Sequence, residues 1–379
     1  MTSIDSSPGP SFWSTAENLI ARRKRLIAEL AQRQLAGCLI TSDEDRTWLS
    51  GFGAASHDTV PVAVLLVGQI RQVLLTSANN VDWAASEAPG LEVMAWHRPW
   101  WRTLGEALYG LDWPTIGYQG DHLSVTAYTS LMGSFHANRA FDDLDDMLAS
   151  LRAVKDDGEI RTLRRAVEIT DVAFHSATAG LTAGTSEREL ARSLDAAMRR
   201  HGASDPGFPT IVASGPNAAR PHHAPTDRPI QAGEPVIIDM GARFDSYTAD
   251  LTRTVWVGEP DPLLAEIYPI VERASAAAQA AARAGVAGRD VDAAARQVIA
   301  DAGYGDAFIH GVGHGVGLAI HERPGAGRQS VDTLAAGHTL TIEPGIYLPG
   351  WGGVRIEDMG IVTAAGFDRL TAARKADLT

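Results

Sequence analysis

The sequence predicts an α+β protein with two domains, and three observations lead to this prediction. The chain has 379 residues, enough for two domains at about 150 residues each. Seven of its nine tryptophans lie before residue 114, so the first third differs in composition from the rest. Helical and strand patterns then alternate in blocks, as in α+β folds. We therefore expect domains at 1–153 and 154–379.

The first domain is predicted to begin with a helix and to continue as an α/β unit. Ser14 and Glu17 fit a capping box, and apolar residues recur at helical spacing until Gly37. Short apolar runs then predict strands at 38–40, 62–67 and 72–75. Three tryptophans, Trp96, Trp100 and Trp101, form a cluster that could cover a neighbouring active site in an oligomer, but buried packing within this domain is the preferred interpretation.

The second domain is predicted to hold four helices and two regions rich in strands. One helix follows the boundary near 153–158, and another begins at Ser186, with Glu189 completing a capping box, and stops at Gly202. The other helices are expected around 262–285 and 290–301, and the strand-rich regions at 235–257 and 339–363.

Charge and composition exclude several classes of protein. The chain carries 33 basic and 46 acidic residues, a net charge of −13, which disfavours binding to nucleic acid. The one basic cluster, Arg22–Arg25, fits the solvent-facing side of a helix. A single cysteine, Cys38, excludes internal disulfides and favours a reducing compartment. We predict a cytoplasmic protein without nucleic-acid or membrane partners, since no apolar stretch is long enough to span a bilayer.

Two acidic residues face each other in a predicted hairpin over 236–257. Apolar runs flank a polar centre, and a turn between Phe244 and Asp245 would place Asp239 opposite Asp250. Directly opposed side chains lie about 5 Å apart, where like charges destabilise a sheet. Positive charge must therefore lie nearby.

A second predicted hairpin, over 341–358, repeats this arrangement. Its Pro/Gly-rich middle is centred on Gly350, which places Glu343 opposite Glu357. Four carboxylates about 4 Å apart would each repel a neighbour by roughly 4 kcal/mol at an effective dielectric of 20. A metal site explains both pairs at once.

Between the hairpins lies the segment 310–322, in which glycine occupies every second position from 311 to 317. This pattern disfavours a helix, whereas a strand would put the glycines on one face and His310 and His314 together on the other. A glycine face lets another backbone approach closely. Carboxylates with one or two imidazoles suit Mn, Fe, Co or Zn. Two divalent ions balance four carboxylates and leave room for a bridging hydroxide.

These residues resemble the pita-bread metallopeptidase family, which includes prolidase, aminopeptidase P, methionine aminopeptidase and the metal-free creatinase. The similarity covers roughly residues 155–379 and shows five signatures in the expected order. They are Ser214–Asn217 through His222, Ile238-Asp239, Ala249–Thr254, His310–Glu322, and Glu343–Gly345 with Arg355–Asp358. The first 150 residues resemble the creatinase-type N-terminal domain of the prolidase and aminopeptidase P branch.

The resemblance implies a pita-bread catalytic domain behind a smaller α/β domain, and a site with two divalent metal ions. The implied metal ligands are Asp239, Asp250, His314, Glu343 and Glu357. Asp250 and Glu357 would bridge the ions, and a bridging hydroxide would be the nucleophile. Glu343 would also carry the proton to the leaving nitrogen.

The resemblance also implies roles around the metals. His310 and His321 would contact the substrate or stabilise the oxyanion, and His222 would line the pocket. Arg355 would hold a ligand carboxylate. Glu322 is expected either to bind substrate or to face solvent, and Asp358 to serve a turn or a salt bridge.

The function that follows is that of a metallopeptidase of the Xaa-Pro aminopeptidase or Xaa-Pro dipeptidase type. It would cleave X-Pro bonds at the N-terminus of short peptides or dipeptides, using two ions of Mn, Co, Zn or Fe. An alternative is a small non-peptide substrate, as in creatinase, ectoine hydrolase or the sulfonium lyases of this fold. A catalytically inactive binding protein is disfavoured because all five ligands are present. Analogy with related enzymes suggests a homodimer.

Overall fold

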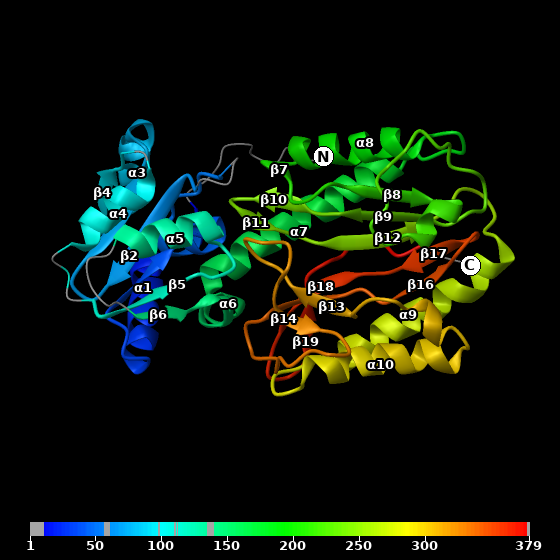
Figure 1. Ribbon diagram of the computed structural model, residues 1–379. Coiled ribbons are helices and arrows are strands. Elements are labelled where there is room, and N and C mark those ends of the chain that lie inside the picture. Colours follow the sequence, from blue (N-terminus) through cyan, green and yellow to red (C-terminus); the bar gives the residue numbers. More distant parts are fainter. Residues whose placement is uncertain are drawn as a thin grey trace. The chain divides into compact units, whose positions relative to one another are not determined.

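The computed structural model describes residues 11–56, 61–97, 99–109, 111, 113–134 and 140–376. The chain divides into two compact units, one formed by Ser11–Arg152 and the other containing the chain from Ala153 onward. Helices and strands are mixed in both units, as the predicted α+β class requires (Figure 1). Within the described residues, no helix is both long and apolar enough to cross a membrane.

The first unit is built on a six-stranded mixed sheet with the order β4-β3-β2-β1-β5-β6. Its strands are β1 (Gly37–Ile40), β2 (Ala63–Gly68), β3 (Gln72–Thr76), β4 (Glu92–Ala95), β5 (Thr115–Tyr118) and β6 (Ala140–Asp143). Its helices are α1 (Ala16–Gln32), α2 (Asp43–Ser50), η1 (Ala78–Asn80), α3 (Val81–Glu87), α4 (Trp100–Leu108), α5 (Val125–Ser134) and α6 (Asp145–Ala153). Trp96 and Trp100 are buried with ring centroids 6.5 Å apart, as predicted.

Two details of α1 differ from the sequence-based prediction. Its N-cap is Thr15 rather than Ser14, and the Thr15 hydroxyl accepts a hydrogen bond from the backbone of Asn18. The prediction that the basic cluster faces solvent is wrong for Arg22 and Arg23, which are each 2% exposed. Both donate to backbone carbonyls near the C-terminal end of α2, at Trp48 and Leu49 respectively. These terminal carbonyls lack helical partners, so buried guanidinium groups can satisfy them.

The second unit places its strands between helices, with α8 on one side and α9 and α10 on the other (Figure 1). Its helices are α7 (Asp157–Thr178), α8 (Glu187–Arg200), η2 (Gly215–Ala219), α9 (Pro262–Ala281), α10 (Gly288–Asp301) and η3 (Gly305–Ala307). The strands before α9 are β7 (Asp205–Pro206), β8 (Ile211–Ser214), β9 (Val236–Met240), β10 (Ala242–Phe244), β11 (Tyr247–Thr248) and β12 (Leu251–Val255). Those after α10 are β13 (Gly313–Gly315), β14 (Glu322–Ala326), β15 (Thr339–Ile342), β16 (Gly345–Leu348), β17 (Gly352–Arg355), β18 (Asp358–Val362) and β19 (Phe367–Arg369).

The helices of this unit begin and end where the local sequence directs. The capping box predicted at the start of α8 is present, with Ser186 and Glu189 exchanging hydrogen bonds. The helix ends before Gly202, whose φ of 107° is unfavourable for other residues. α7 also begins with a capping box, formed by Asp156 and Glu159.

Two apolar cores hold the strands in place from opposite sides. In one core, α7 and α8 pack on β8, β9 and β12 through residues such as Leu194 and Ile238. In the other, α9 and α10 pack on β15 to β18 through residues such as Val271 and Val354. Asp239 lies in β9, and the other predicted acids lie beside the ends of these strands, so all four are held between two packed helical layers.

Candidate metal centre

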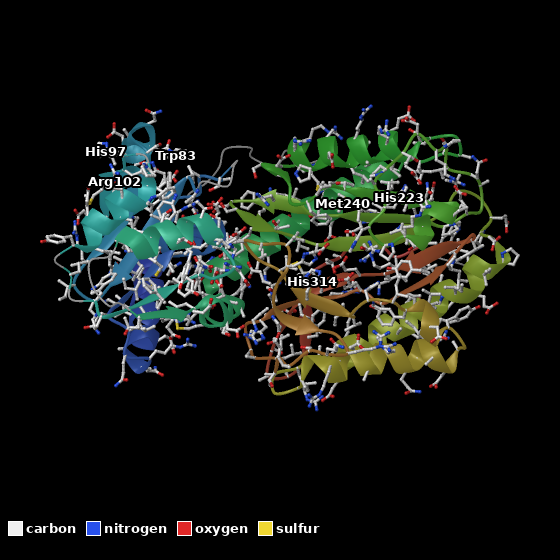
Figure 2. All side chains as sticks on the ribbon, in the orientation of Figure 1. Trp83, His97, Arg102, His223, Met240 and His314 are labelled. Carbon is white, nitrogen blue, oxygen red and sulfur yellow. The ribbon has the colours of Figure 1, made fainter. Side chains whose placement is uncertain are left out.

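One cavity of about 670 Å³ in the second unit is lined by every residue predicted for the site. These residues are His222, Asp239, Asp250, His310, His314, His321, Glu343, Arg355 and Glu357. They come from the two hairpins, from β13 and the loops around it, and, for His222, from the loop after η2. Figure 2 labels His314, which lies in β13. The remaining walls are partly apolar, with Phe208 and Ile309 among them.

The hairpin that carries Asp239 and Asp250 has a different register from the one predicted. Asp239 lies opposite Thr252. The turn residues Asp245 and Ser246 have φ values of 46° and 71°, so the turn is centred one residue later than predicted. Asp250 is therefore diagonal to Asp239 rather than directly opposite. A shift of two positions along a strand keeps a side chain on the same face, so the two carboxylates still meet.

The second hairpin has the predicted register. Gly345 lies opposite Arg355 in the ladder between β16 and β17, and the ladder between β15 and β18 continues the same register. Glu343 and Glu357 occupy the opposed positions between these two ladders. The second pair of acids is thus placed by the turn around Gly350, as the sequence indicates.

The predicted long strand over the glycine-rich segment is wrong, because only Gly313–Gly315 forms a strand. His310 and His314 nevertheless line the same cavity. The expected role of the glycines is confirmed, since a Cβ atom on Gly313 would lie 1.9 Å from the carbonyl oxygen of Thr341. Glycine here allows β13 to approach β15 closely enough to bring His314 beside the acids.

Three of the acids form a cluster suited to a metal ion. Asp239, Asp250 and Glu357 each contribute an oxygen, and these oxygens lie within 4.8 Å of one another. Oδ1 of Asp239 and Oε1 of Glu357 are buried and have no hydrogen-bond partner among the described residues. Leaving such atoms without a partner is costly. A divalent cation would satisfy both oxygens, so the donor set fits a metal.

His314 presents the correct nitrogen to this cluster. Its Nδ1 lies 3.0 Å from the carbonyl oxygen of Gly315, which can only accept, so Nδ1 carries the hydrogen. Nε2 faces the acids, 3.3 Å from Glu343 Oε1 and 3.7 Å from Asp250 Oδ2. A histidine whose second nitrogen donates to a backbone carbonyl is the usual arrangement of a metal ligand.

The protonation equilibria of the acids show how strongly they interact. Burial, with further repulsion from neighbouring carboxylates, raises the pKa of both Asp250 and Glu357 well above its usual range. Burial also disfavours the charge of Glu343, but the hydrogen bond and charge of His314 outweigh it and lower its pKa to about 2. All of these acids can be ionised together at neutral pH only if cations lie among them.

Arg355 connects the cluster to a tyrosine that the sequence analysis missed. Its Nη2 donates to Asp239 Oδ2 at 2.7 Å, and its Nη1 donates to the Tyr347 hydroxyl at 3.0 Å. The same hydroxyl lies 2.8 Å from His310 Nε2. Nδ1 of His310 lies 2.7 Å from the Gly311 carbonyl, so the neutral ring accepts from the tyrosine. Strand alternation offered a signal, since Tyr347 lies four residues after Glu343.

The structure excludes both alternatives expected for Glu322 and places two further neighbouring residues. Glu322 neither faces solvent nor enters the cavity: it is paired with Lys155 in the interior. Asp358 forms the expected salt bridge, with Arg253 at 2.8 Å. The ring of His321 lies against that of His314 with a centroid distance of 4.4 Å.

Two family models match the chain. The model of metallopeptidase family M24 matches residues 161–364. The model of the creatinase/prolidase N-terminal domain matches residues 22–154. The first covers the whole acidic cluster and all four cavity histidines. The second covers most of the first unit and the first two residues of the second unit.

Relatives and solved structures agree with these matches. An Xaa-Pro dipeptidase from Pyrococcus furiosus is 43% identical over 264 residues, which is 69% of this chain and 74% of that protein. The structure of an Xaa-Pro dipeptidase from Bacillus anthracis superposes with a TM-score of 0.89 at 34% identity, covering 95% of this chain and 99% of the other. An X-Pro aminopeptidase from Thermotoga maritima gives a TM-score of 0.84 at 32% identity, with coverage of 94% and 99%.

Proposed function

Because this chain belongs to metallopeptidase family M24, we propose that it is a dinuclear metal-dependent hydrolase that cleaves X-Pro bonds at the N-terminus of short peptides or dipeptides. The names of its relatives support this substrate class. The observation that carries the proposal is the buried cluster of Asp239, Asp250 and Glu357, with two oxygens that have no hydrogen-bond partner among the described residues.

Five side chains would hold two divalent ions, of Mn, Co, Zn or Fe. They are Asp239, Asp250, His314, Glu343 and Glu357. By resemblance to the family, both ions would share Asp250 and Glu357. Burial and neighbouring carboxylates raise the pKa of both acids, so both need positive charge nearby. When bound, the two ions would lower the pKa of a bridging water and so supply a hydroxide nucleophile at neutral pH.

The residues around the ions would handle the proton and the substrate. Glu343 would accept the proton of the attacking water and pass it to the proline nitrogen, which must gain a proton to leave as an amine. His222, His310 and His321 lie around the cluster and would contact the substrate or stabilise the oxyanion. Arg355 would keep Asp239 oriented through their 2.7 Å hydrogen bond.

The walls of the cavity suit a proline ring. Phe208, Ile211, Ile309 and Ile320 provide apolar surface beside the polar cluster. An X-Pro bond has no N–H, so its nitrogen requires no acceptor from the enzyme. An apolar wall can therefore accommodate this bond better than an ordinary peptide bond, whose N–H would lose its partner.

A substrate panel with metal analysis tests the proposal. The protein is loaded with Mn or Co and assayed on Xaa-Pro dipeptides and Xaa-Pro-Xaa tripeptides, with matched Xaa-Ala peptides as the control. We expect turnover of the proline peptides only, two metal ions per chain, and loss of both metal and turnover in Glu357→Gln. Creatine and cyclic amidines are included. Turnover of these compounds without any peptide cleavage would overturn the proposal.

A further inference from the structure

We propose that Glu187 is a positioning residue for His222: its buried carboxylate fixes the segment 214–228, which forms one wall of the active-site cavity. Glu187 lies at the start of α8, and its side chain is fully buried. It lines no part of the cavity itself. The effect of Glu187 on catalysis through His222 rests on the proposed function, whereas its effect on the segment 214–228 does not.

The Glu187 carboxylate is the common acceptor for four residues of the segment. Oε1 accepts from the Ser214 backbone at 2.8 Å, from the Ser214 hydroxyl at 2.9 Å and from the Asn217 side chain at 3.0 Å. Oε2 accepts from the Thr226 backbone at 3.0 Å and from the Thr226 hydroxyl at 2.7 Å. His223 Nε2 lies 3.0 Å from the same oxygen. One side chain thus fixes both ends of the segment.

His222 and His223 are adjacent in sequence but face different surroundings. His222 lines the cavity together with Arg220 and Pro221. His223, which Figure 2 labels, is buried and directed at Glu187. The contact between His223 and Glu187 therefore sets the backbone from which His222 extends.

The other side of the segment is held by the second hairpin. A Cβ atom on Gly353 would lie 2.3 Å from the Ala218 carbonyl oxygen, so η2 packs directly on β17. Arg355, which also donates to Asp239, donates to the Pro221 carbonyl oxygen at 3.3 Å. The segment therefore lies between the Glu187 carboxylate and the arginine of the acidic cluster. A shift on the Glu187 side would move His222 relative to that cluster.

The arrangement requires a carboxylate and not merely a polar side chain. Each oxygen of Glu187 faces donors, so an amide in its place would direct its NH₂ group at several of them. Burial disfavours the charge, but the hydrogen bonds from Thr226, Asn217 and Ser214 outweigh it and lower the pKa to about 2. Glu187→Gln therefore preserves the shape of the side chain while breaking the network.

A double-mutant cycle separates positioning from simple destabilisation. We expect Glu187→Gln to lower kcat/KM for an Xaa-Pro peptide by about tenfold, the scale for removing an outer partner of an active-site group. In a His222→Ala background, Glu187→Gln should lower kcat/KM by less than about twofold, because the side chain that Glu187 positions is absent. Glu189→Gln, on the same helical turn but exposed, is the matched control and should leave kcat/KM unchanged. Equal losses in both backgrounds would overturn the proposal.

Hydrogen exchange provides a readout that needs no substrate. The backbone N–H groups of Ser214 and Thr226 donate hydrogen bonds directly to Glu187. Glu187→Gln should therefore speed exchange across 214–228 while β9 stays protected. Glu189→Gln should leave exchange across 214–228 unchanged. Thr226→Val removes one hydroxyl donor to Glu187, and it replaces Glu187→Gln in the exchange experiment if that variant does not fold. If exchange across 214–228 is unchanged in the folded variants, Glu187 does not fix this segment. If the wild-type enzyme cleaves no Xaa-Pro peptide, the proposed function fails while exchange still decides the role of Glu187.

Discussion

Lys155 Nζ lies 2.7 Å from Glu322 Oε2, in an ion pair whose side chains are 0% and 2% exposed. Glu322 directly follows His321 in the chain. Its other carboxylate oxygen accepts a hydrogen bond from the Ala319 backbone at 2.9 Å. The ion pair therefore fixes the turn that presents His321 to the cavity.

Removing the lysine should destabilise the protein more than removing both charges. Lys155→Met leaves a buried carboxylate without its cation, which costs about 3–5 kcal/mol. Lys155→Met combined with Glu322→Gln should recover most of that loss, since glutamine still accepts from Ala319. Urea denaturation measures both free energies of unfolding. Arg164→Met, which breaks a pair that is 51% exposed on each side, should cost less than about 1 kcal/mol. A double variant as unstable as Lys155→Met would contradict this explanation.

Arg355→Lys should weaken metal binding although it keeps the positive charge. The arginine donates to Asp239, Tyr347, Thr252 and Pro221, and a single ammonium cannot reproduce this planar geometry. Loss of an outer partner of a metal ligand typically costs about 10–100-fold in affinity, which calorimetric titration with Mn measures. Arg369→Lys, at an arginine whose side chain is 49% exposed, should bind Mn with the affinity of the wild-type protein. Equal affinities for all three proteins would show that Arg355 does not support the ligand.

His338 should make stability depend on pH. Burial, with the nearby charge of Lys155, lowers its pKa to about 4, and its Nδ1 accepts from the Ala335 backbone at 3.1 Å, which requires a neutral ring. The unfolded histidine binds a proton near pH 6.5. Between about pH 6.5 and 4 the unfolded chain thus holds the extra proton, so the free energy of unfolding falls as pH is lowered.

His338→Asn keeps an acceptor but cannot titrate, so its Tm should fall less steeply than that of the wild-type protein between about pH 6.5 and 4. Calorimetric scans at several pH values give both slopes. A third protein with Ser246→Gly, which removes no titratable group, should keep the wild-type slope. If the His338→Asn slope is also unchanged, another group causes the pH dependence.

Ser246→Gly should stabilise the protein. Ser246 has a φ of 71°, a left-handed conformation that costs an L-residue about 1–2 kcal/mol. Glycine removes this cost but loses more entropy on folding, so the net gain should be about 0.5–1 kcal/mol in urea denaturation. Ser150→Gly, inside α6, should instead lose roughly 0.5 kcal/mol. A Ser246→Gly variant no more stable than the wild-type protein would argue against this turn geometry.

Local features of the sequence predicted those parts of the fold that depend on neighbouring residues. The capping box at Ser186 and the register around Gly350 follow from short-range hydrogen bonding and turn geometry. The turn at Asp245 was misplaced by one residue, because the left-handed positions there hold aspartate and serine instead of glycine. The acids still converge, since the side-chain period of a strand tolerates a shift of two.

The sequence by itself indicated that two pairs of acids, with His310 and His314, could come together, because strand alternation and turn spacing are properties of the local backbone. His222 and His321 were implied only by the resemblance to the family. Tertiary structure alone decided what holds them there. Lys155 meets Glu322 across 167 residues of chain, and Glu187 meets His223 across 36. Arg22 and Arg23, expected in water, are buried against carbonyls at the end of another helix. A charged side chain becomes buried only where packing brings partners to it, and those partners come from elements distant in the sequence.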